Sequence, residues 1–394
     1  MKILFTTYYP EQTGGAEISL ALLMRELKNR GHEIYLASTE EYKGIETFLF
    51  KKFKKMLFFG NQENYVVGFV SKIIKDKNIE LVHANDRLTT IGALKAAKKN
   101  EVKSVVHFRD YWFASPNSSC LTKDYKEYGI CTNKLIMKNY AAYRAPWEIY
   151  KLSYLRKNWK TLGEADLKIV ISNHLRNKLA MCEITKNIYN IPNPINLNLS
   201  KSDKENFKEE NKLKKIVVAY AGSLTYTKGI LNILDVMINI IKENKDISFL
   251  IAGDGELKNQ VLSKIKKNNL KDNIILKKFT HTEMNDVYSN SDIILIPSVW
   301  SEPFGRVAVE AMAFGKPVIS SNLGGLKETV QDGKNGILLN PTDKDKWKIS
   351  ILKLINDENL RMNMGKTGEE LAKNYDVKII TEKIEKLYED LKTS

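Results

Sequence analysis

The chain has 394 residues, of which 43% are hydrophobic and 9% aromatic, enough for two domains with cores of ordinary size. Its 62 basic and 47 acidic residues give a formal net charge of +15, which indicates anionic partners such as nucleotide phosphates or a lipid headgroup surface. We expect no nucleic acid partner, because the sequence has no recognition-helix, RNA-binding or zinc pattern.

The few cysteines and the hydropathy pattern indicate in which cellular compartment the protein is expected. Cys120, Cys131 and Cys182 do not form a disulfide framework, and Cys120 and Cys131 lack the paired Cys or His partners of a metal site, so we expect free thiols. The first residues carry too short an apolar patch for a signal peptide, and no stretch approaches ~18 apolar residues. The expected location is cytoplasmic, with any membrane contact peripheral and at the inner face of the cell membrane.

The first residues show the order strand, glycine loop, helix. Residues 2–6 form an apolar run, residues 8–17 a loop that contains Gly14 and Gly15, and residues 18–27 an amphipathic helix. This order begins a doubly wound unit whose phosphate contact lies at the loop. The spacing is not that of a dinucleotide fingerprint, and a glycine pair alone also suits a simple turn.

Residues 48–59 combine five phenylalanines with four lysines. The pattern predicts a basic aromatic helix, and two interpretations of it remain open. Such a helix can lie in the interface of an anionic membrane. It can equally be a core-facing helix whose outer face is rich in lysine.

Residues 102–112 form a strand that runs into the polar, aromatic loop Arg109-Asp110-Tyr111-Trp112. In open α/β sheets such strand ends line the ligand crevice, which makes Arg109 a candidate site residue. His107 shares a strand face with Arg109 by alternation. Either side chain is a candidate for ligand contact, although a charged arginine cannot act as a general base. For His107 the alternative is a buried strand histidine.

A second doubly wound unit follows a polar, charge-dense linker at residues 196–213. Residues 216–221 form a strand, residues 222–229 a glycine-bounded loop and residues 230–238 a helix. The same order in both halves indicates two similar Rossmann-like domains. Lys228 beside the loop glycine is a natural phosphate ligand, and its alternative is a solvated loop lysine.

The most informative stretch is residues 298–321, which follow an apolar strand. Pro303 and Gly305 start a helix there, with Glu302 just before it and Glu310 inside it. The eight-residue spacing corresponds to ~12 Å along a helix. A helix N-terminus attracts phosphate and carboxylates accept bonds from hydroxyls, so the stretch suits a sugar, a diphosphate and a ribose in a row. The alternative, in which Glu310 only faces solvent, conflicts with its apolar neighbours.

The segment Glu302-Pro-Phe-Gly-Arg-Val-Ala-Val-Glu310-Ala resembles the Glu-x7-Glu signature of retaining glycosyltransferases of family 4. The resemblance covers nearly the whole chain and is strongest from residue 222 to residue 341. It implies an α/β GT-B fold with two Rossmann-like doubly wound domains facing across a cleft. The expected domains are 1–195 on the acceptor side, joined by a C-terminal helix at about 376–394, and 214–375 for the nucleotide sugar.

The same resemblance suggests a role for each matching residue. Glu302 would contact the donor sugar and Glu310 the ribose, while Lys228 matches a phosphate-binding lysine. The family arginine of the loop is Ser223 here, and Arg306 is the candidate to replace its charge. Arg109 aligns with a family histidine that touches the donor sugar. The remaining donor-binding candidates are Gly14, Gly15, Gly222, Ser223, Phe304, Gly305 and Val307.

We therefore expect a retaining glycosyltransferase that moves a sugar from a nucleoside-diphosphate sugar to a glycan or lipid-linked acceptor, in cell-surface polysaccharide or glycolipid biosynthesis. Lys228, Arg306 and the helix start would stabilise the leaving diphosphate, and no metal or cofactor is expected. Two alternatives remain: a non-catalytic scaffold that binds nucleotide sugars or glycans, and an epimerase of the same fold. A nicotinamide dehydrogenase would need a glycine fingerprint that the chain lacks.

Overall fold

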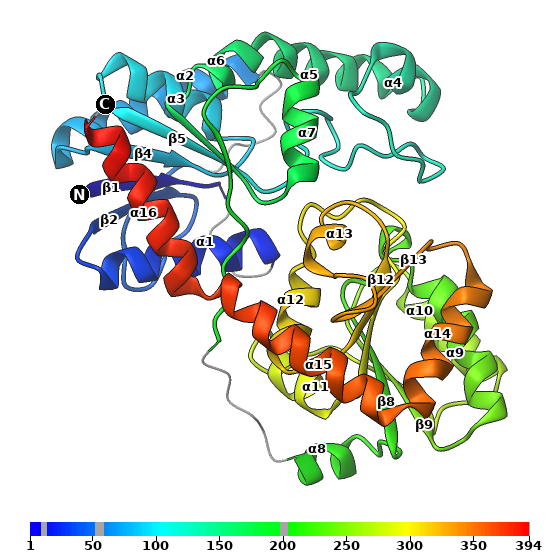
Figure 1. Cartoon of the computed structure of the whole chain (residues 1–394). Coiled ribbons are helices and arrows are strands. Elements are labelled where there is room, and N and C mark those ends of the chain that lie inside the picture. Colours follow the sequence, from blue (N-terminus) through cyan, green and yellow to red (C-terminus); the bar gives the residue numbers. More distant parts are fainter. Residues whose placement is uncertain (9–13, 52–58, 198–203, 394) are drawn as a thin grey trace. The chain divides into compact units, whose positions relative to one another are not determined.

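The computed structural model describes residues 1–8, 14–51, 59–197 and 204–393. The chain divides into two compact units, of which the first comprises residues 1–194 with 377–394 and the second residues 195–376. Each unit is a parallel sheet covered by helices (Figure 1). Among the described residues, none of the helices has the length and apolar character needed to span a bilayer.

The first unit contains seven parallel strands in the order β3-β2-β1-β4-β5-β6-β7. From β1 the chain moves outward to β2 and β3 and then places β4 on the other side of β1. Ligands of doubly wound sheets bind at the carboxyl ends of the strands beside such a reversal. The strands are β1 (Lys2–Thr6), β2 (Glu33–Ser38), β3 (Glu46–Leu49), β4 (Leu81–Ala84), β5 (Lys103–Phe108), β6 (Leu167–Val170) and β7 (Ile188–Asn190).

Helices cover both faces of this sheet because its strands are apolar on both sides. Ile3 and Phe5 belong to the core beneath α1 and α16, whereas Leu4 between them belongs to the core beneath α2 and α3. The helices are α1 (Gly15–Asn29), α2 (Phe59–Lys77), α3 (Thr90–Lys99), α4 (Asn133–Asn139), α5 (Ala145–Lys157), α6 (Trp159–Gly163), α7 (Asn173–Met181) and α16 (Val377–Thr393).

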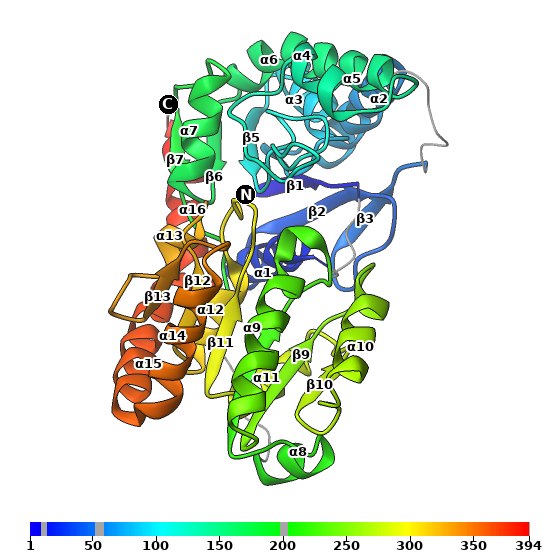
Figure 2. The ribbon, with the colours of Figure 1, turned by 90° about the vertical axis from the view of Figure 1, so that its right-hand side faces the viewer.

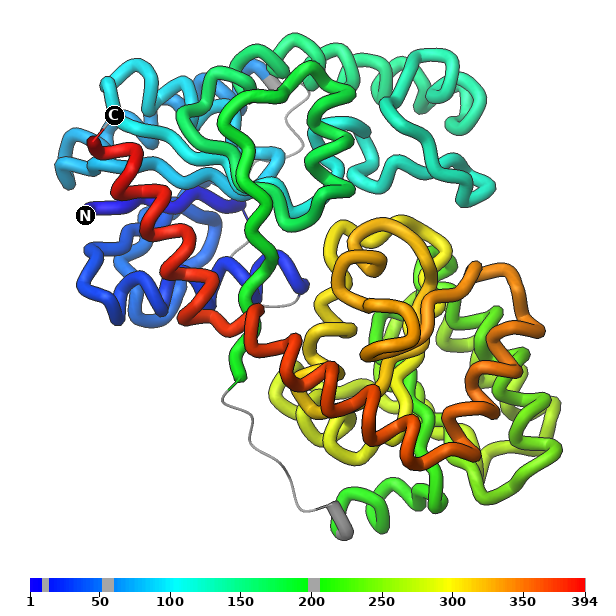
Figure 3. Tube along the Cα trace, viewed as in Figure 1, coloured from blue at the N-terminus to red at the C-terminus, as the bar shows by residue number. Residues whose placement is uncertain are grey.

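Helix α16 completes the first unit although the whole second unit precedes it in the chain. Its fully buried face consists of Ile380, Ile384 and Tyr388, spaced four residues apart, and packs into the same core as α1. At its edge, the Arg30 Nη1 atom lies 3.0 Å from the Glu385 carboxylate. The red end of the trace in Figure 3 runs beside the blue α1 for this reason.

The second unit repeats this winding with six parallel strands in the order β10-β9-β8-β11-β12-β13. The strand order reverses between β8 and β11, as it does between β1 and β4. In Figure 2 the strand labels of this sheet run from β13, β12 and β11 on the left to β9 and β10 on the right. They are β8 (Ile216–Ala221), β9 (Ile247–Ala252), β10 (Ile274–Lys277), β11 (Ile293–Ile296), β12 (Val318–Ser321) and β13 (Gly336–Leu339).

The main core of the second unit lies between its sheet and α9, where buried side chains recur every three to four residues from Ile230 to Ile241. Trp347 of α14 fills the same core and is 2% exposed. The helices are α8 (Lys204–Glu210), α9 (Ile230–Glu243), α10 (Lys258–Lys267), α11 (Met284–Asn290), α12 (Arg306–Ala313), α13 (Leu326–Thr329), α14 (Lys344–Asn356) and α15 (Glu358–Ala372), with the short 3-10 helices η1 (Tyr226–Lys228) and η2 (Lys373–Tyr375).

Two predicted segments differ in the structure. The helix predicted at 48–59 is wrong at its start, where β3 pairs with β2 and Phe50 is 3% exposed against Phe69; residues 52–58 lie outside the described residues. The linker predicted at 196–213 contains helix α8, because Phe207 packs on Phe279 with 6.1 Å between ring centroids. In both places an aromatic side chain finds a hydrophobic partner that is distant in sequence.

Candidate active site

At the carboxyl edge of the second sheet, the Glu302 side chain lies between a lysine and a serine. The Lys228 Nζ atom is 2.9 Å from Glu302 Oε1, and the Ser298 hydroxyl donates to the same oxygen. Glu302 is 9% exposed, and the Lys228 side chain is 27% exposed. Lys228 also lies over the Trp300 ring, 5.6 Å from its centroid. The structure thus brings together a cation and a carboxylate from the loops after β8 and β11.

Close backbone contacts hold these two loops together. The Val299 N–H donates to the Thr227 carbonyl at 2.9 Å. Gly229 follows Lys228 with a φ of +69°, and a Cβ there would lie 1.9 Å from the Pro297 carbonyl oxygen. Only glycine fits both conditions. Backbone contacts therefore hold the loop that carries Lys228 against the loop that carries Glu302.

A glycine pair after β12 fixes the other side of the Glu302 loop. The Gly325 N–H donates to the Glu302 carbonyl at 2.7 Å. A Cβ at Gly324 would lie 2.4 Å from that same carbonyl oxygen, and one at Gly325 2.5 Å from the Pro303 carbonyl oxygen. In the sequence the pair is visible only as two adjacent glycines that follow an apolar strand. Its contribution to the site is the close approach of backbone to backbone.

Helix α12 begins beside Glu302. Its N-cap residue, Gly305, is left-handed with a φ of +96°, and a Cβ there would meet Leu326 Cδ2 at 2.6 Å. The first N–H groups of a helix have no partner within it and carry a partial positive charge. Lys228 and the start of α12, four residues after Glu302, therefore both supply positive charge to this part of the site.

Glu310 lies one turn into α12, and each of its two carboxylate oxygens accepts a hydrogen bond from a neighbouring side chain. Arg306 Nε donates to its Oε1 at 2.6 Å, and the Tyr288 hydroxyl donates to its Oε2 at 2.8 Å. Tyr288 is completely buried, and that burial, with the Glu310 charge, raises its pKa well above the usual value, so the phenol stays a donor. The acid among apolar neighbours is thus paired, as its position required. Arg306, expected to meet a diphosphate, is one of its two partners.

The other donor-side candidates contribute in different ways. Phe304 is 5% exposed and packs on Tyr375, 5.8 Å between ring centroids, so its side chain belongs to the core and only its backbone lies at the helix start. Val307 is half-buried in the first turn of α12. Ser223 is exposed, and its carbonyl accepts a 2.8 Å bond from Tyr220 next to Gly222.

In the first unit, the loops after β1 and β4 meet at the equivalent edge. Gly14 caps α1 and Gly15 begins it, while the Glu17 carboxylate folds back over Gly14. Asp86, after β4, accepts bonds from the Tyr8 N–H at 2.7 Å and the Thr89 hydroxyl at 2.7 Å. Burial raises the pKa of both carboxyls, and for Glu17 the Arg109 charge partly offsets it.

Arg109 and His107 lie close together, but neither is open to solvent. His107 is 0% exposed and Arg109 5% exposed, and Arg109 Nη2 lies 3.2 Å from His107 Nδ1. The other Arg109 nitrogen, Nη1, donates to the Asn193 side chain. A fully buried His107 has no surface to offer a ligand, so its expected catalytic contact does not fit the structure. Its position suits support of Arg109.

A chain of buried polar rings continues from His107 to the C-terminal helix. The His107 and His83 rings lie 5.4 Å apart, and His83 Nδ1 is hydrogen-bonded to the Tyr388 hydroxyl of α16. Burial first, and then the Arg109 charge, lowers the pKa of both histidines well below the usual value. Both are therefore neutral near pH 7, beside a buried guanidinium.

Asp110 extends this edge of the first unit. Its carboxylate accepts a 2.7 Å bond from the Trp112 N–H. Burial raises its pKa to about 6, although that bond and the Arg87 charge act in the opposite direction. The first unit thus places three carboxyls with raised pKa at one sheet edge: Glu17, Asp86 and Asp110.

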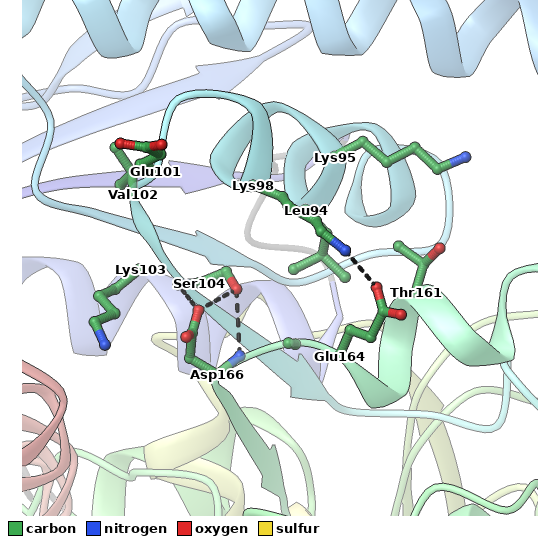
Figure 4. Close-up of a pocket in the computed structure, with 11 residues that line it drawn as sticks. Leu94, Lys95, Lys98, Glu101, Val102, Lys103, Ser104, Thr161, Glu164 and Asp166 are labelled. Atoms are coloured by element: carbon green, nitrogen blue, oxygen red, sulfur yellow. Dashed lines mark hydrogen bonds and ion pairs between the residues drawn. The ribbon is translucent and has the colours of Figure 1, made fainter. Parts of the chain in front are cut away.

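A pocket of about 570 Å³ lies at the opposite edge of the first sheet (Figure 4). It opens at the amino ends of β5 and β6, where Lys98 pairs with Glu164 at 2.9 Å. Asp166 accepts bonds from the Ser104 N–H and hydroxyl at 2.8 and 2.7 Å. Ligands of doubly wound sheets bind at the carboxyl ends instead, so this pocket is separate from the candidate site.

Some site residues had no clear sequence signal. Tyr288 and Trp300 reach Glu310 and Lys228 through packing, and no motif spacing marks them. Ser298 opens the 298–321 stretch, yet only the structure shows its bond to Glu302.

Comparison with known proteins agrees with this architecture. The family model described as Glycosyltransferase Family 4 matches residues 13–199, and the model described as Glycosyl transferases group 1 matches residues 201–371. The chain belongs to the family 4 glycosyltransferases of the GT-B fold and is an enzyme of the glycosyltransferase class.

Individual relatives cover most or all of the chain. It is 29% identical to an uncharacterised glycosyltransferase of Methanocaldococcus jannaschii, over 99% of both chains. It is 27% identical to the capsular polysaccharide biosynthesis glycosyltransferase CapM of Staphylococcus aureus, over 61% of this chain and 65% of that one. Anabaena HepE, solved in complexes with UDP and with UDP-glucose, has a TM-score of 0.77 at 20% identity, over 99% of this chain and 100% of HepE.

Proposed function

We propose that this enzyme transfers a sugar from a nucleoside-diphosphate sugar to a glycan or lipid-linked acceptor, with retention of the anomeric configuration, in cell-surface polysaccharide biosynthesis. The observation that carries the proposal is the pair formed by Lys228 and Glu302, 2.9 Å apart, beside the N-terminus of α12. The pair combines a cation for a phosphate with an acceptor for a sugar hydroxyl. UDP-sugars are the first donors to test, since HepE was solved with UDP and UDP-glucose.

Each side chain has a distinct part in this proposal. Lys228 and the first N–H groups of α12 stabilise the negative charge that grows on the leaving diphosphate. Glu302 accepts hydrogen bonds from the donor sugar and orients its anomeric carbon. Glu310, held by Arg306 and Tyr288, accepts bonds from the ribose hydroxyls. All of these groups belong to the second unit.

Transfer and simple binding are separated by measuring the release of nucleoside diphosphate across UDP-, GDP- and ADP-sugars, with glycan and lipid-linked acceptors present. We expect turnover with one class of base. Binding of a donor without turnover under any acceptor would instead favour the scaffold alternative. Conversion of one nucleotide sugar into its epimer, with no acceptor present, would favour the epimerase.

Retention needs its own experiment. The anomeric proton of the transferred sugar, followed by NMR before any mutarotation, should show the configuration of the donor. The opposite configuration in the first product formed would exclude a retaining mechanism while leaving glycosyl transfer intact.

The proposed acceptor side is the first unit, at the edge that carries Gly15, Glu17 and Asp110. Burial raises the pKa of Glu17 and raises that of Asp110 to about 6. A carboxyl with a raised pKa is protonated more readily than an exposed one, so it can exchange hydrogen bonds with a neutral hydroxyl group at a smaller desolvation cost. A cytoplasmic enzyme working at the inner face of the membrane would meet a lipid-linked acceptor there. Membrane contact through residues 48–59 stays a prediction, weakened at Phe50, which packs into the core.

A further inference from the structure

Helices α4 and α5 expose large apolar side chains. Met137 on α4 is 69% exposed, Trp147 on α5 is 38% exposed, and Tyr143 in their connection is 84% exposed. Exposed apolar groups that gather on neighbouring elements mark interaction surfaces. Figures 1 and 2 both place α4 and α5 in the outer layer of helices of the first unit.

These side chains are not needed for the packing of the two helices. A small core of Cys131, Ile136, Ala145 and Leu152 already joins α4 to α5, and the three exposed side chains lie outside it. Thr132 caps α4 by accepting a 3.2 Å bond from the Leu135 N–H. The pair therefore folds without them. We use the term outer side for its exposed side chains, Lys134, Met137, Lys138, Tyr143, Arg144 and Trp147.

The same segment is strongly basic. Residues 128–163 contain seven lysines and arginines and one acid, Glu148. That acid is 3% exposed and pairs with Lys151 at 2.8 Å, so no acidic side chain of the segment faces solvent. Lys134, Lys138 and Arg144 are exposed and form no ion pair among the described residues. The outer side therefore presents cations, and the segment contains no exposed acid to pair with them.

The aromatic residues are of the kind found at a lipid-water boundary. Trp147 stacks on Tyr150 with 5.3 Å between ring centroids, and the Lys151 Nζ atom lies 5.7 Å from the Trp147 ring centroid. Trp and Tyr combine an apolar ring with a polar edge and are enriched at the headgroup level of membranes. Lysine and arginine can extend their charge to lipid phosphates from the same depth.

We propose that the outer side of α4 and α5, with Tyr143 at its tip, docks on the surface of an anionic phospholipid bilayer. Apolar side chains enter the acyl boundary by ~5–10 Å in such contacts, while neighbouring cations bind the headgroups. An acidic protein partner would pair with the cations, but charge pairing does not account for an aromatic side chain as exposed as Tyr143. This surface does not depend on the proposed donor or acceptor, so binding is measured without turnover.

The test is co-sedimentation of the full chain with vesicles of phosphatidylcholine plus phosphatidylglycerol, and with vesicles of phosphatidylcholine alone. We expect binding to the mixed vesicles, weakened by salt. The triple variant Lys134→Ser, Lys138→Ser, Arg144→Ser should bind about a hundredfold more weakly. The double variant Tyr143→Ser, Trp147→Ser should bind about tenfold more weakly.

Matched control variants change the same chemistry in the second unit. Lys266→Ser, Lys267→Ser, Lys271→Ser removes three exposed lysines, and Ile349→Ser, Met362→Ser removes two apolar side chains that are each 65% exposed. Both controls should bind vesicles as the unmodified protein does. Equal losses in control and test variants would show that net charge or general apolarity is responsible, and would overturn the proposal.

A second measurement locates the contact without removing it. The three native cysteines are buried, so Tyr143→Cys supplies an exposed thiol for a polarity-sensitive dye, with Ile349→Cys as the comparison. The dye emission at position 143 should shift to shorter wavelength on mixed vesicles, and that at 349 should not. No shift at 143, binding only to an acidic protein, or self-association through the tip in size-exclusion chromatography would each overturn lipid docking.

Discussion

In the second unit each candidate acid is paired with a cation, whereas in the first unit the equivalent sheet edge carries acids held by neutral donors. Glu302 pairs with Lys228, and Glu310 with Arg306. Asp86 and Asp110 accept their bonds from backbone N–H groups and a threonine hydroxyl, and burial raises their pKa. Two sheets with the same winding thus offer different electrostatic environments at the same topological position.

The difference matches the chemistry expected on each side. A diphosphate carries charge that grows as its bond to the sugar breaks, and it needs fixed cations and helix N–H groups. A hydroxyl acceptor is neutral and needs hydrogen-bonding groups whose protonation is adjustable. The fold supplies the reversal point in both units, and the loop residues decide what it binds.

The largest expected effect is on the cationic edge of the second unit. Lys228→Ala should lower kcat by about 10²–10³-fold, because one fixed charge on the leaving group is removed and Glu302 loses its partner. The measurement is steady-state release of nucleoside diphosphate. Lys242→Ala, an exposed lysine at the end of α9, is the control. A change below about threefold in Lys228→Ala would remove the proposed role of this pair.

Asp110 should make the stability of the first unit depend on pH. The folded-state pKa of Asp110, about 6, lies above the unfolded value of about 3.9, so the folded chain holds this proton more tightly. The stabilisation from protonated Asp110 is present below about pH 4 and is lost as the pH rises through 6, at most about 3 kcal/mol.

Urea unfolding at a series of pH values tests this sign. Asp110→Asn should flatten the decline between about pH 4 and pH 6. Asp345→Asn on the exposed first turn of α14 is the control and should leave the curve unchanged. An Asp110→Asn curve that runs parallel to that of the unmodified protein would show that Asp110 does not titrate in this window.

A smaller effect is expected inside the first unit. Tyr388→Phe removes the hydroxyl bonded to buried His83 Nδ1 and should cost about 1–3 kcal/mol in the free energy of unfolding. Tyr143→Phe, at an 84% exposed position, should cost nothing measurable. Equal stability of the two variants would mean that the hydrogen bond between Tyr388 and His83 adds no stability.

The smallest effect concerns how Glu310 is held. Tyr288→Phe removes the donor to Glu310 Oε2 while Arg306 remains, and donor affinity should fall about fivefold, or about 1 kcal/mol. Isothermal titration with UDP measures it, and Tyr189→Phe on the exposed part of β7 is the control. Unchanged affinity would place the ribose away from Glu310.

The sequence predicted the features that depend on local patterns. Continuous apolar runs identified the buried parallel strands, and the Glu302 to Glu310 spacing identified the helix that separates the two acids. The short edge strand β3 was missed, because its four residues, two exposed and two half-buried, carry no apolar run and pair only with β2.

Features that depend on contacts between residues distant in sequence could not be predicted from local patterns. The sequence of helix α8 has the charge-dense composition of a linker, and its contact between Phe207 and Phe279 is visible only in the structure. Full burial of His107 follows from His83 and from a helix almost three hundred residues later, which alternation along one strand cannot show. Tyr288 reaches Glu310 from α11, and no spacing within the motif contains that residue.

The placement of α16 has a consequence for biosynthesis. The ribosome produces the first 194 residues, then the whole second unit, and only afterwards the helix that covers α1. Until then Leu20, Leu23 and Leu27 lack the cover that Ile380 and Ile384 provide. The nascent first unit therefore carries an open apolar groove while the second can fold to completion, a reversal of the usual order in which N-terminal domains finish first.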